Sequence, residues 1–379
     1  MSIPFAPHVV FAGGGTGGHL LPGLNIAQRV TQKLPDAIIS FVGTGKPLER
    51  HVVREHGYQY VAIPSYPAPA GPLQAFRFMT DNVAGYWAAR WLLRDQKASL
   101  VVGLGGLGSG AAIRAAAARG LPTVMLEQNA VPSLVSRWLA RGASAICAGF
   151  EQICDALPAG ANVHIVGNPV RPELEAKASR VHSRTSHSSN QPRRLVILGG
   201  NLGANTLNRV VPSALARVKD QLRGWAVVHQ AGPGRVEQTV QRYEEAGVNA
   251  LTVGILDDAA DVLAESDLAV SRAGGTTLAE LALVGAPAVI IPFPDAADGH
   301  QLANARIYAE AGACRVIDEE SAGDRLDVEL AAQLGALLAD DAARGEMTTA
   351  IRQLARPDAA SDIAQLVIDL AQGRTVAAA

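Results

Sequence analysis

A glycine-rich segment that ends in a histidine lies near the start of this 379-residue chain. Residues 13–19 read GGGTGGH and follow the apolar run Val9–Ala12. Glycines let backbone N–H groups close around a phosphate or sugar oxygen, and a helix predicted over Leu20–Val30 directs its positive end to the same point. Because an imidazole accepts a proton near neutral pH, His19 is a candidate general base beside a bound polar ligand. The alternative is a tight strand–helix turn with a solvent-facing histidine.

A second glycine turn follows another predicted strand, Leu268–Val270. Residues 271–280 read SRAGGTTLAE, so the N–H groups of Gly275, Thr276 and Thr277 are predicted to open a helix. Such a helix start can hold a diphosphate.

Three polar side chains follow this turn at spacings that suit a sugar nucleotide. Glu280 lies about one turn into the predicted helix, where its carboxylate can accept both hydroxyl protons of a ribose. An acid that only complements the helix dipole is the alternative. Gln301 and Asn304 are three residues apart, so a helix places both amides on one face, as sugar hydroxyls require.

The composition excludes several classes of protein. A chain of 379 residues with 48% hydrophobic content can bury two cores, and a net charge of −2 gives no electrostatic case for nucleic acid. Cys147, Cys154 and Cys314 lack metal-ligand spacing and indicate reduced cytosolic thiols. The longest uncharged apolar stretch, Leu281–Pro294, is too short and too proline-broken to span a bilayer. We expect a soluble or peripherally bound protein.

The elements that must position these residues repeat one plan twice. Strands alternate with helices in both halves, which predicts an α/β fold with two Rossmann-like, doubly wound domains and a ligand cleft at the carboxyl ends of their sheets. The predicted strands are Val9–Ala12, Ala37–Val42, Leu100–Leu104, Thr123–Leu126, Ala145–Ala148 and Val163–Val166, then Arg194–Leu198, Ala226–His229, Leu251–Val253, Leu268–Val270 and Ala288–Pro292.

A polar segment separates the two halves. Residues 177–194 contain no acid and no apolar periodicity, so they are predicted to be exposed and flexible. The predicted boundaries are therefore 1–170 for the first domain, 171–194 for a flexible basic connector and 195–355 for the second domain.

Several motifs, in the same order along the chain, resemble the MurG family of glycosyltransferase family 28. They are GGGTGGHLLPGL (13–24), EQNAVPS (127–133), GNPVR (167–171), LGGNLGANTLN (198–208), HQAG (229–232), SRAGGTTLAELALVGAPAVIIPFP (271–294) and GHQLANA (299–305). The resemblance runs from about residue 8 to 320. It implies a GT-B fold with an interdomain cleft, an acceptor-binding and membrane-associated N-terminal domain, a C-terminal domain that binds the UDP-sugar donor, and a final helix near 359–372 that packs on the first domain.

The resemblance also implies an activity: inverting transfer of N-acetylglucosamine from UDP-N-acetylglucosamine to undecaprenyl-linked lipid I, which gives lipid II in peptidoglycan synthesis. The reaction would take place at an anionic membrane surface, on the cytoplasmic face of the cell inner membrane. We expect no cofactor and no obligatory metal ion, because no Asp-x-Asp motif stands in a suitable position and Asp257-Asp258 precedes a predicted helix.

Site residues are carried over by position. His19 is the first choice for the base, and Glu127 is the second choice or the group that orients the imidazole. With Asn129 and Asn208, these residues are expected to face the reacting centre from the first domain. Glu280 is implied to bind the ribose, Arg272 to lie near the diphosphate, and the backbone of Leu256 to read the uracil. The implied substrate-binding residues are Thr16, Gly17, Gly18, Asn129, Arg171, Asn201, Asn208, Leu256, Arg272, Gly275, Thr276, Thr277, Glu280, His300, Gln301 and Asn304.

Some positions depart from the family pattern. Leu126 stands where the family commonly has His, and residues 105–111 read GGLGSGA in place of GGYVSGP. Asn201 replaces a usual Ser, while Leu202 and His300 replace a frequent Gln. The loss of a His and a Tyr concerns the acceptor side more than the donor side. Two alternatives stay open: another UDP-sugar enzyme, such as a 2-epimerase or a different lipid-acceptor transferase, and a non-catalytic scaffold for cell-wall or division proteins.

An aromatic stretch over residues 73–94 bears on the acceptor. Aromatic side chains with basic neighbours suit the interface of an anionic leaflet, whereas an amphipathic helix packed into the core is the alternative. The resemblance favours the membrane. The residues concerned are Phe76, Phe78, Trp87 and Trp91, with Arg77, Arg90 and Arg94.

Overall fold

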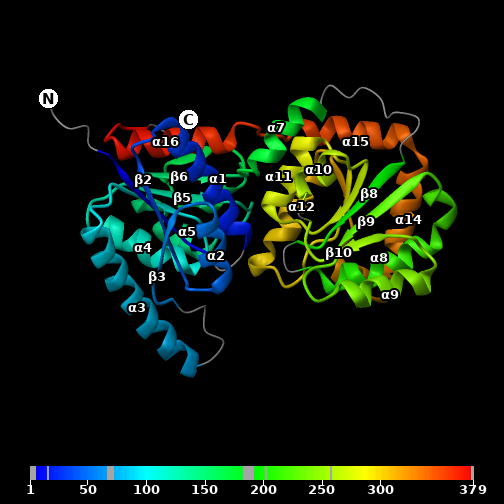
Figure 1. The fold of residues 1–379 in the computed structure, drawn as a ribbon, viewed down its shortest axis with the longest axis horizontal. Coiled ribbons are helices and arrows are strands. Elements are labelled where there is room, and N and C mark those ends of the chain that lie inside the picture. The colour runs from blue at the N-terminus through cyan, green and yellow to red at the C-terminus, as the bar shows by residue number, and fades with distance from the viewer. Residues whose placement is uncertain are drawn as a thin grey trace. The chain divides into compact units, whose positions relative to one another are not determined.

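The computed structural model describes residues 6–14, 17–65, 72–181, 192–200, 203–256 and 258–376. The chain divides into two compact units, Met1–Pro169 with Asp358–Ala379, and Val170–Pro357. Each unit contains one parallel sheet covered by helices (Figure 1). The predicted α/β class with two doubly wound domains is confirmed.

The first sheet has seven parallel strands in the order β3-β2-β1-β4-β5-β6-β7. Its inner strands are buried on both faces, which explains their continuous apolar sequences. Ala12 lies opposite both Val42 and Gly103, so the segments that follow β1, β2 and β4 leave the sheet at one edge. The strands are β1 (His8–Ala12), β2 (Ile38–Gly43), β3 (Gln59–Ala62), β4 (Leu100–Gly103), β5 (Thr123–Glu127), β6 (Ala145–Ala148) and β7 (Val163–Ile165).

Helices cover both faces of this sheet. Val9 and Phe11 point to a core shared with α1 and α16, while Val10 and Ala12 point to a core shared with α3 and α4. The last helix, α16, thus packs against α1, and Figure 1 shows it in red beside the first sheet. The helices are α1 (Gly17–Lys33), α2 (Pro47–Glu55), α3 (Pro72–Asp95), α4 (Leu107–Ala117), α5 (Leu134–Leu139), α6 (Ile153–Ala156) and α16 (Ala359–Ala371).

The second sheet has six parallel strands in the order β10-β9-β8-β11-β12-β13. Leu195 and Ile197 of β8 pack with Leu207 of α8 and Leu334 of α14 in one core. The strands are β8 (Arg193–Leu198), β9 (Trp225–Gln230), β10 (Leu251–Val253), β11 (Leu268–Ser271), β12 (Ala288–Ile290) and β13 (Cys314–Val316). The helices are α7 (Pro172–Val181), α8 (Asn205–Arg217), α9 (Val236–Ala246), α10 (Ala259–Ala264), α11 (Gly275–Val284), α12 (His300–Glu310), α13 (Glu319–Ala322), α14 (Leu326–Ala339) and α15 (Asp341–Gln353).

The structure corrects three details of the sequence prediction. Residues 172–181 of the predicted connector form α7, because Leu174 and Ala178, one helical turn apart, are both buried; residues 182–191 lie outside the described ranges. Strands β3 and β13 are missing from the prediction, since edge strands are short and lack a fully apolar sequence. Helix α1 begins at Gly17, so His19 lies inside the helix and not at the end of a loop.

Helix α3, with 24 residues, is long enough to raise the question of whether a helix crosses a membrane. Within the described ranges, no helix combines the length and apolar character that crossing a membrane requires.

Candidate functional site

His19 lies in the first turn of α1, beside the edge where β1 and β4 end. Its Nδ1 is 3.1 Å from the carbonyl oxygen of Leu104, the residue after β4. A carbonyl oxygen can only accept, so Nδ1 carries the proton in this hydrogen bond. In the neutral imidazole the lone pair is then on Nε2, the tautomer in which Nε2 can accept a proton.

Two glycines make room for this arrangement. Gly105 has a φ of +96°, and a Cβ there would lie 3.0 Å from Nδ1 of His19. Gly13 has a φ of +140°, and a Cβ there would lie 2.9 Å from Cβ of Leu104. Side chains at either position would therefore be strained and would displace the segment that orients the imidazole.

Glu127 ends β5 and is buried. Its Oε2 accepts hydrogen bonds from the backbone N–H of Ser133 at 2.9 Å and the hydroxyl of Ser136 at 2.7 Å. Its Oε1 accepts a longer one from the N–H of Asn129 at 3.4 Å. The carboxylate thus holds together the segment that carries Asn129. Both carboxylate oxygens of Glu127 thus accept hydrogen bonds from the protein.

A second buried carboxylate, Glu49 of α2, went unnoticed in the sequence. It accepts hydrogen bonds from the backbone N–H of Thr44 at 2.9 Å and from the hydroxyl of Tyr60 at 2.6 Å. A Cβ on Gly14 would lie 2.6 Å from its Oε1, so the carboxylate packs directly under the glycine turn. The only sequence signal is an acid in the first turn of a helix, which is too common to single out a residue.

In the second unit, α11 begins without a side-chain cap. Its N-cap is Gly274, and the first helical hydrogen bond runs from the N–H of Leu278 to the carbonyl of Gly274. The N–H groups of Gly275, Thr276 and Thr277 therefore have no partner within the helix. The hydroxyl of Thr276 is also buried, and it has no hydrogen-bond partner among the described residues. This helix start offers an anion several donors and the positive end of a dipole.

Glu280 lies in the second turn of α11 and is buried, while Arg171 precedes α7. Nε of Arg171 donates to Oε1 of Glu280 at 2.6 Å. Burial raises the pKa of Glu280, and the guanidinium of Arg171 opposes this shift by its charge and its hydrogen bond. The Arg171–Glu280 pair thus keeps a carboxylate available close to the start of α11.

Arg272, expected to lie near the diphosphate, follows β11 and makes several contacts within the protein. One guanidinium nitrogen donates to the carbonyl oxygens of Ile291 at 3.1 Å and Pro292 at 3.0 Å. The same nitrogen pairs with Glu319, which also accepts a hydrogen bond from the hydroxyl of Thr206 at 2.7 Å. These contacts pair the charge of Arg272 with Glu319 and join the ends of β11 and β12.

The two amides of α12 lie on one face, as predicted, but they hold protein backbone. Oε1 of Gln301 accepts from the N–H groups of Ala273 at 3.1 Å and Phe293 at 3.0 Å. Asn304 is fully buried and donates to the carbonyl of Ala273 at 3.1 Å, so in this structure it supports the turn before α11 and exposes no amide to a sugar. His300, at the start of α12, contacts the carbonyl of Ala297 through Nδ1 at 2.7 Å.

The prediction for Asn208 is corrected. It belongs to the second unit, not the first, because it lies on α8. Its side chain is buried, donates to the carbonyl of Ala231 at 2.9 Å and contacts Nε2 of His229 at 3.0 Å. Burial lowers the pKa of His229 to about 3, and Nδ1 of this histidine meets the hydroxyl of Tyr243. This polar chain fixes the end of β9 and contains no group exposed to a substrate.

The remaining expected site positions lie outside the described part of the chain or show few contacts within it. Thr16, Asn201, Leu202 and Asp257 lie outside the described residues, and Gly17 and Gly18 are described only as the backbone that opens α1. Leu256 lies between β10 and α10. Leu126, where the family has His, is buried in the core of the first unit. Among the described residues, no group of three or more His, Cys, Asp or Glu is placed to hold a metal ion.

The aromatic stretch forms α3, and much of it faces solvent. Phe76, Trp87 and Trp91 are 65%, 61% and 66% exposed, so they do not pack into the core; Phe78 is partly buried. Helix α5 adds Trp138, which is 72% exposed and which sequence reasoning missed because a short helix far along the chain carries it. We name these five aromatic residues of α3 and α5 the aromatic face. Met79 and Val83 of α3 and Leu134 of α5 are exposed as well.

Comparisons with known proteins extend over nearly the whole chain. The model of the glycosyltransferase family 28 N-terminal domain matches residues 9–148, and that of the C-terminal domain matches residues 194–363. Two relatives are named UDP-N-acetylglucosamine--N-acetylmuramyl-(pentapeptide) pyrophosphoryl-undecaprenol N-acetylglucosamine transferase. The protein from Aromatoleum aromaticum is 37% identical over 95% of this chain and 97% of its own. The protein from Nitratidesulfovibrio vulgaris is 33% identical over 97% of this chain and 98% of its own.

A solved structure agrees with these relatives. The crystal structure of Acinetobacter baumannii MurG superposes with a TM-score of 0.76 at 27% identity, covering 96% of this chain and 99% of that one. The match spans both sheets, so the motifs of the glycine turns and the fold that carries them point to the same group of proteins. The chain belongs to glycosyltransferase family 28.

Proposed function

We propose that this chain transfers N-acetylglucosamine from UDP-N-acetylglucosamine to the muramyl sugar of undecaprenyl-linked lipid I, with inversion at C1, and so produces lipid II. The observation that carries the proposal is its identity of 33% and 37%, along nearly its full length, to relatives named for this transfer. The proposal is supported by a candidate base, a helix start with open N–H groups and a buried carboxylate, since such a transfer needs groups of these kinds.

The donor belongs, in this proposal, to the second unit. The N–H groups of Gly275, Thr276 and Thr277 receive the diphosphate, and the positive end of α11 stabilises the charge that grows on UDP as it leaves. Glu280 accepts the ribose hydroxyls while Arg171 favours its ionised form, and the backbone at Leu256 reads the uracil. Because Glu319 balances the charge of Arg272, the helix start supplies most of the stabilisation. No step in this scheme uses a metal ion or cofactor.

The base, in this proposal, is His19 of the first unit. The attacking hydroxyl approaches C1 opposite the departing UDP, through a transition state with oxocarbenium character. Nε2 of His19 takes the hydroxyl proton, since Nδ1 is committed to the carbonyl of Leu104. Glu127 shapes the segment that bears Asn129, and Glu49 supports the glycine turn from below.

The membrane surface, in this proposal, meets the aromatic face. An undecaprenyl chain cannot leave the bilayer cheaply, because each CH₂ exposed to water costs about 0.8 kcal/mol. Exposed aromatics on α3 and α5, with Arg77 and Arg94 exposed beside them, suit the interface of an anionic leaflet. We therefore place the protein peripherally on the cytoplasmic face of the inner membrane.

The deciding experiment incubates the purified protein with lipid I and radiolabelled UDP-N-acetylglucosamine in detergent micelles. We expect label in a lipid-soluble product that carries one added N-acetylglucosamine in β linkage. Release of the 2-epimer without acceptor would indicate an epimerase. Tight UDP-sugar binding with no turnover would indicate a scaffold.

A further inference from the structure

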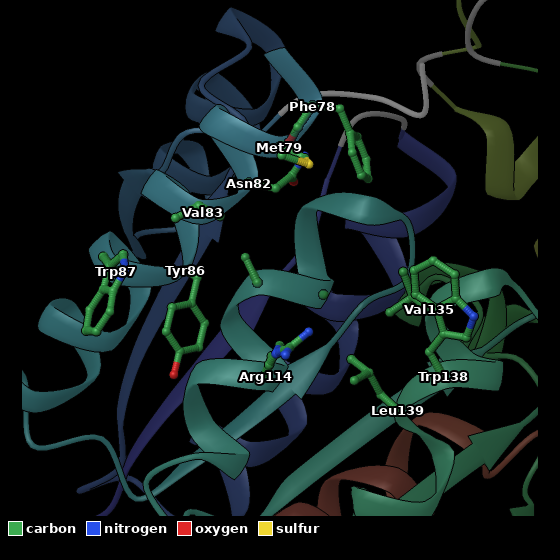
Figure 2. Close-up of a pocket in the computed structure, with 12 residues that line it drawn as sticks. Phe78, Met79, Asn82, Val83, Tyr86, Trp87, Arg114, Val135, Trp138 and Leu139 are labelled. Carbon is green, nitrogen blue, oxygen red and sulfur yellow. Dashed lines mark hydrogen bonds between the residues drawn. The ribbon is translucent and has the colours of Figure 1, made fainter. Parts of the chain in front are cut away.

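An open pocket of about 560 Å³ lies in the first unit among α3, α4 and α5 (Figure 2). Phe78, Tyr86 and Trp87 of α3 form one side, and Trp138 of α5 forms the other. Its volume lies within the range of about 300–1,000 Å³ that is usual for small-molecule sites. The pocket is a hollow, so a single hydrocarbon chain can enter it.

The floor of the pocket comes from α4, where Gly110 and Ala111 contribute almost no side-chain volume. A Cβ at Gly110 would meet the methyl groups of Val135 at 3.6 Å, which is ordinary contact distance. Close packing against α5 therefore does not demand glycine there, and the small residues chiefly leave room for a ligand.

One cation lies beside the apolar walls. Arg114 of α4 lines the pocket and, in Figure 2, lies between the side chains of α3 and those of α5. Largely apolar walls beside the guanidinium of Arg114 fit a hydrocarbon chain that ends in an anionic group, because the guanidinium can pair with phosphate oxygens.

The same helix connects the pocket to the candidate base. Gly105, just before α4, is the residue whose Cβ would touch Nδ1 of His19, and Gly110 lies five residues further along. Because α4 begins at Leu107, Gly110 lies in its first turn, and at 1.5 Å per residue the rise from Leu107 to Gly110 is about 5 Å. A sugar at His19 and a chain in the pocket can thus belong to one molecule joined by a diphosphate.

We propose that this pocket binds the first isoprenoid units of the lipid-linked acceptor, next to its diphosphate, and so selects an isoprenyl diphosphate over the bulk lipids of the bilayer. The inference rests on the proposed function, since it assigns the chain to the acceptor of that reaction. It differs from membrane docking because a single chain enters the hollow while the exposed aromatic side chains remain at the interface.

The test measures binding of geranyl diphosphate, a water-soluble isoprenyl diphosphate, by calorimetry with the full chain and no membrane. We expect saturable binding that UDP does not displace, and binding of inorganic diphosphate weaker by about tenfold or more. Ala111→Phe fills the floor and should abolish binding, whereas Ala117→Phe, at an exposed position of the same helix, should leave it unchanged.

A second pair of variants avoids changes in packing. Arg114→Gln should weaken binding about tenfold, because a charge-assisted contact to phosphate is lost, and the exposed Arg119→Gln should have no effect. Absence of binding to the wild type, displacement by UDP, or unchanged binding to both Ala111→Phe and Arg114→Gln would overturn the proposal. Equal competition by dihexanoyl-phosphatidylglycerol would assign the pocket to bulk lipid.

The binding measurement needs no turnover, so it tests the pocket proposal separately from the proposed transfer reaction. A protein that binds geranyl diphosphate in this pocket but never transfers sugar to lipid I would contradict only the proposed function. If the protein transfers sugar to lipid I, its kcat/KM should be higher for an isoprenyl acceptor than for a matched acceptor that carries a methyl group in place of the chain. Ala111→Phe should remove this preference.

Discussion

Arg171 donates a 2.6 Å hydrogen bond from Nε to Oε1 of Glu280, a carboxylate buried in the second turn of α11. The two residues are 109 positions apart in the sequence. Without the guanidinium, this carboxylate would carry its charge in a poorly hydrated site, which is costly. The guanidinium therefore offsets part of the cost of ionising a buried acid next to an uncapped helix start.

Loss of the carboxylate should weaken donor binding. We expect Glu280→Ala to reduce the affinity for UDP-N-acetylglucosamine by about 2 kcal/mol, because two charge-assisted hydrogen bonds to the ribose are lost. Calorimetry measures the change, with the exposed Glu310→Ala of α12 as a matched control. Unchanged affinity in a folded Glu280→Ala variant would remove Glu280 from the donor site.

Loss of the guanidinium should change the pH dependence. Burial raises the pKa of Glu280 and Arg171 lowers it, so Arg171→Gln should raise the pKa further. Donor affinity needs the ionised acid, so its decline on acidification should begin at a higher pH in the variant than in the wild type. Titrations with UDP between about pH 5 and 8 test this.

The same shift has a defined sign for stability. The folded pKa of Glu280 lies above its unfolded value, so its contribution to folding is favourable at low pH and is lost as pH rises through the folded pKa. Arg171→Gln should therefore cost more stability at neutral than at mildly acidic pH in urea unfolding. An equal cost at both pH values would contradict the role of Arg171 in holding the charge.

Removal of the imidazole should affect turnover and spare binding. If His19 is the base, His19→Ala lowers kcat by roughly 10²–10⁴ while the affinity for UDP stays near that of the wild type. His56→Ala is the matched control, since His56 is exposed and its Nδ1 also contacts a backbone carbonyl. Nearly normal turnover of the His19→Ala variant would transfer the role of base to Glu127.

Removal of exposed aromatics should release the protein from vesicles. Phe76→Ser with Trp91→Ser changes two side chains of the aromatic face that do not line the pocket. We expect a smaller fraction bound to phosphatidylglycerol vesicles, and binding by the wild type should fall as salt screens the arginines. The control is Leu251→Ser, which removes an exposed apolar side chain from the second unit. Equal binding by the double variant and the wild type would show that the membrane-docking surface is not the aromatic face.

The sequence by itself determined most of the fold and the positions of the turns. Inner strands such as Val9–Ala12 and Leu268–Val270 are recognisable because helices cover both faces of a parallel sheet, which demands continuous apolar residues. Gly13 and Gly105 mark turns for a different reason: each has a positive φ, which few residues other than glycine adopt. The start of α11 was predictable from Gly274 and Gly275 after a strand.

Only the tertiary structure decided which polar side chains form hydrogen bonds within the protein. Asn208 and His229 form a hydrogen bond with each other in the core, and Glu127 accepts hydrogen bonds from Ser133 and Ser136. Nothing local in the sequence distinguishes these side chains from catalytic groups. The aromatic face likewise depends on α5 lying near α3, which brings Trp138 to Trp87 across the pocket. Hydrogen-bond partners and exposure arise from long-range packing, whereas local sequence sets backbone conformation and burial pattern, so the fold was predictable and the state of each side chain was not.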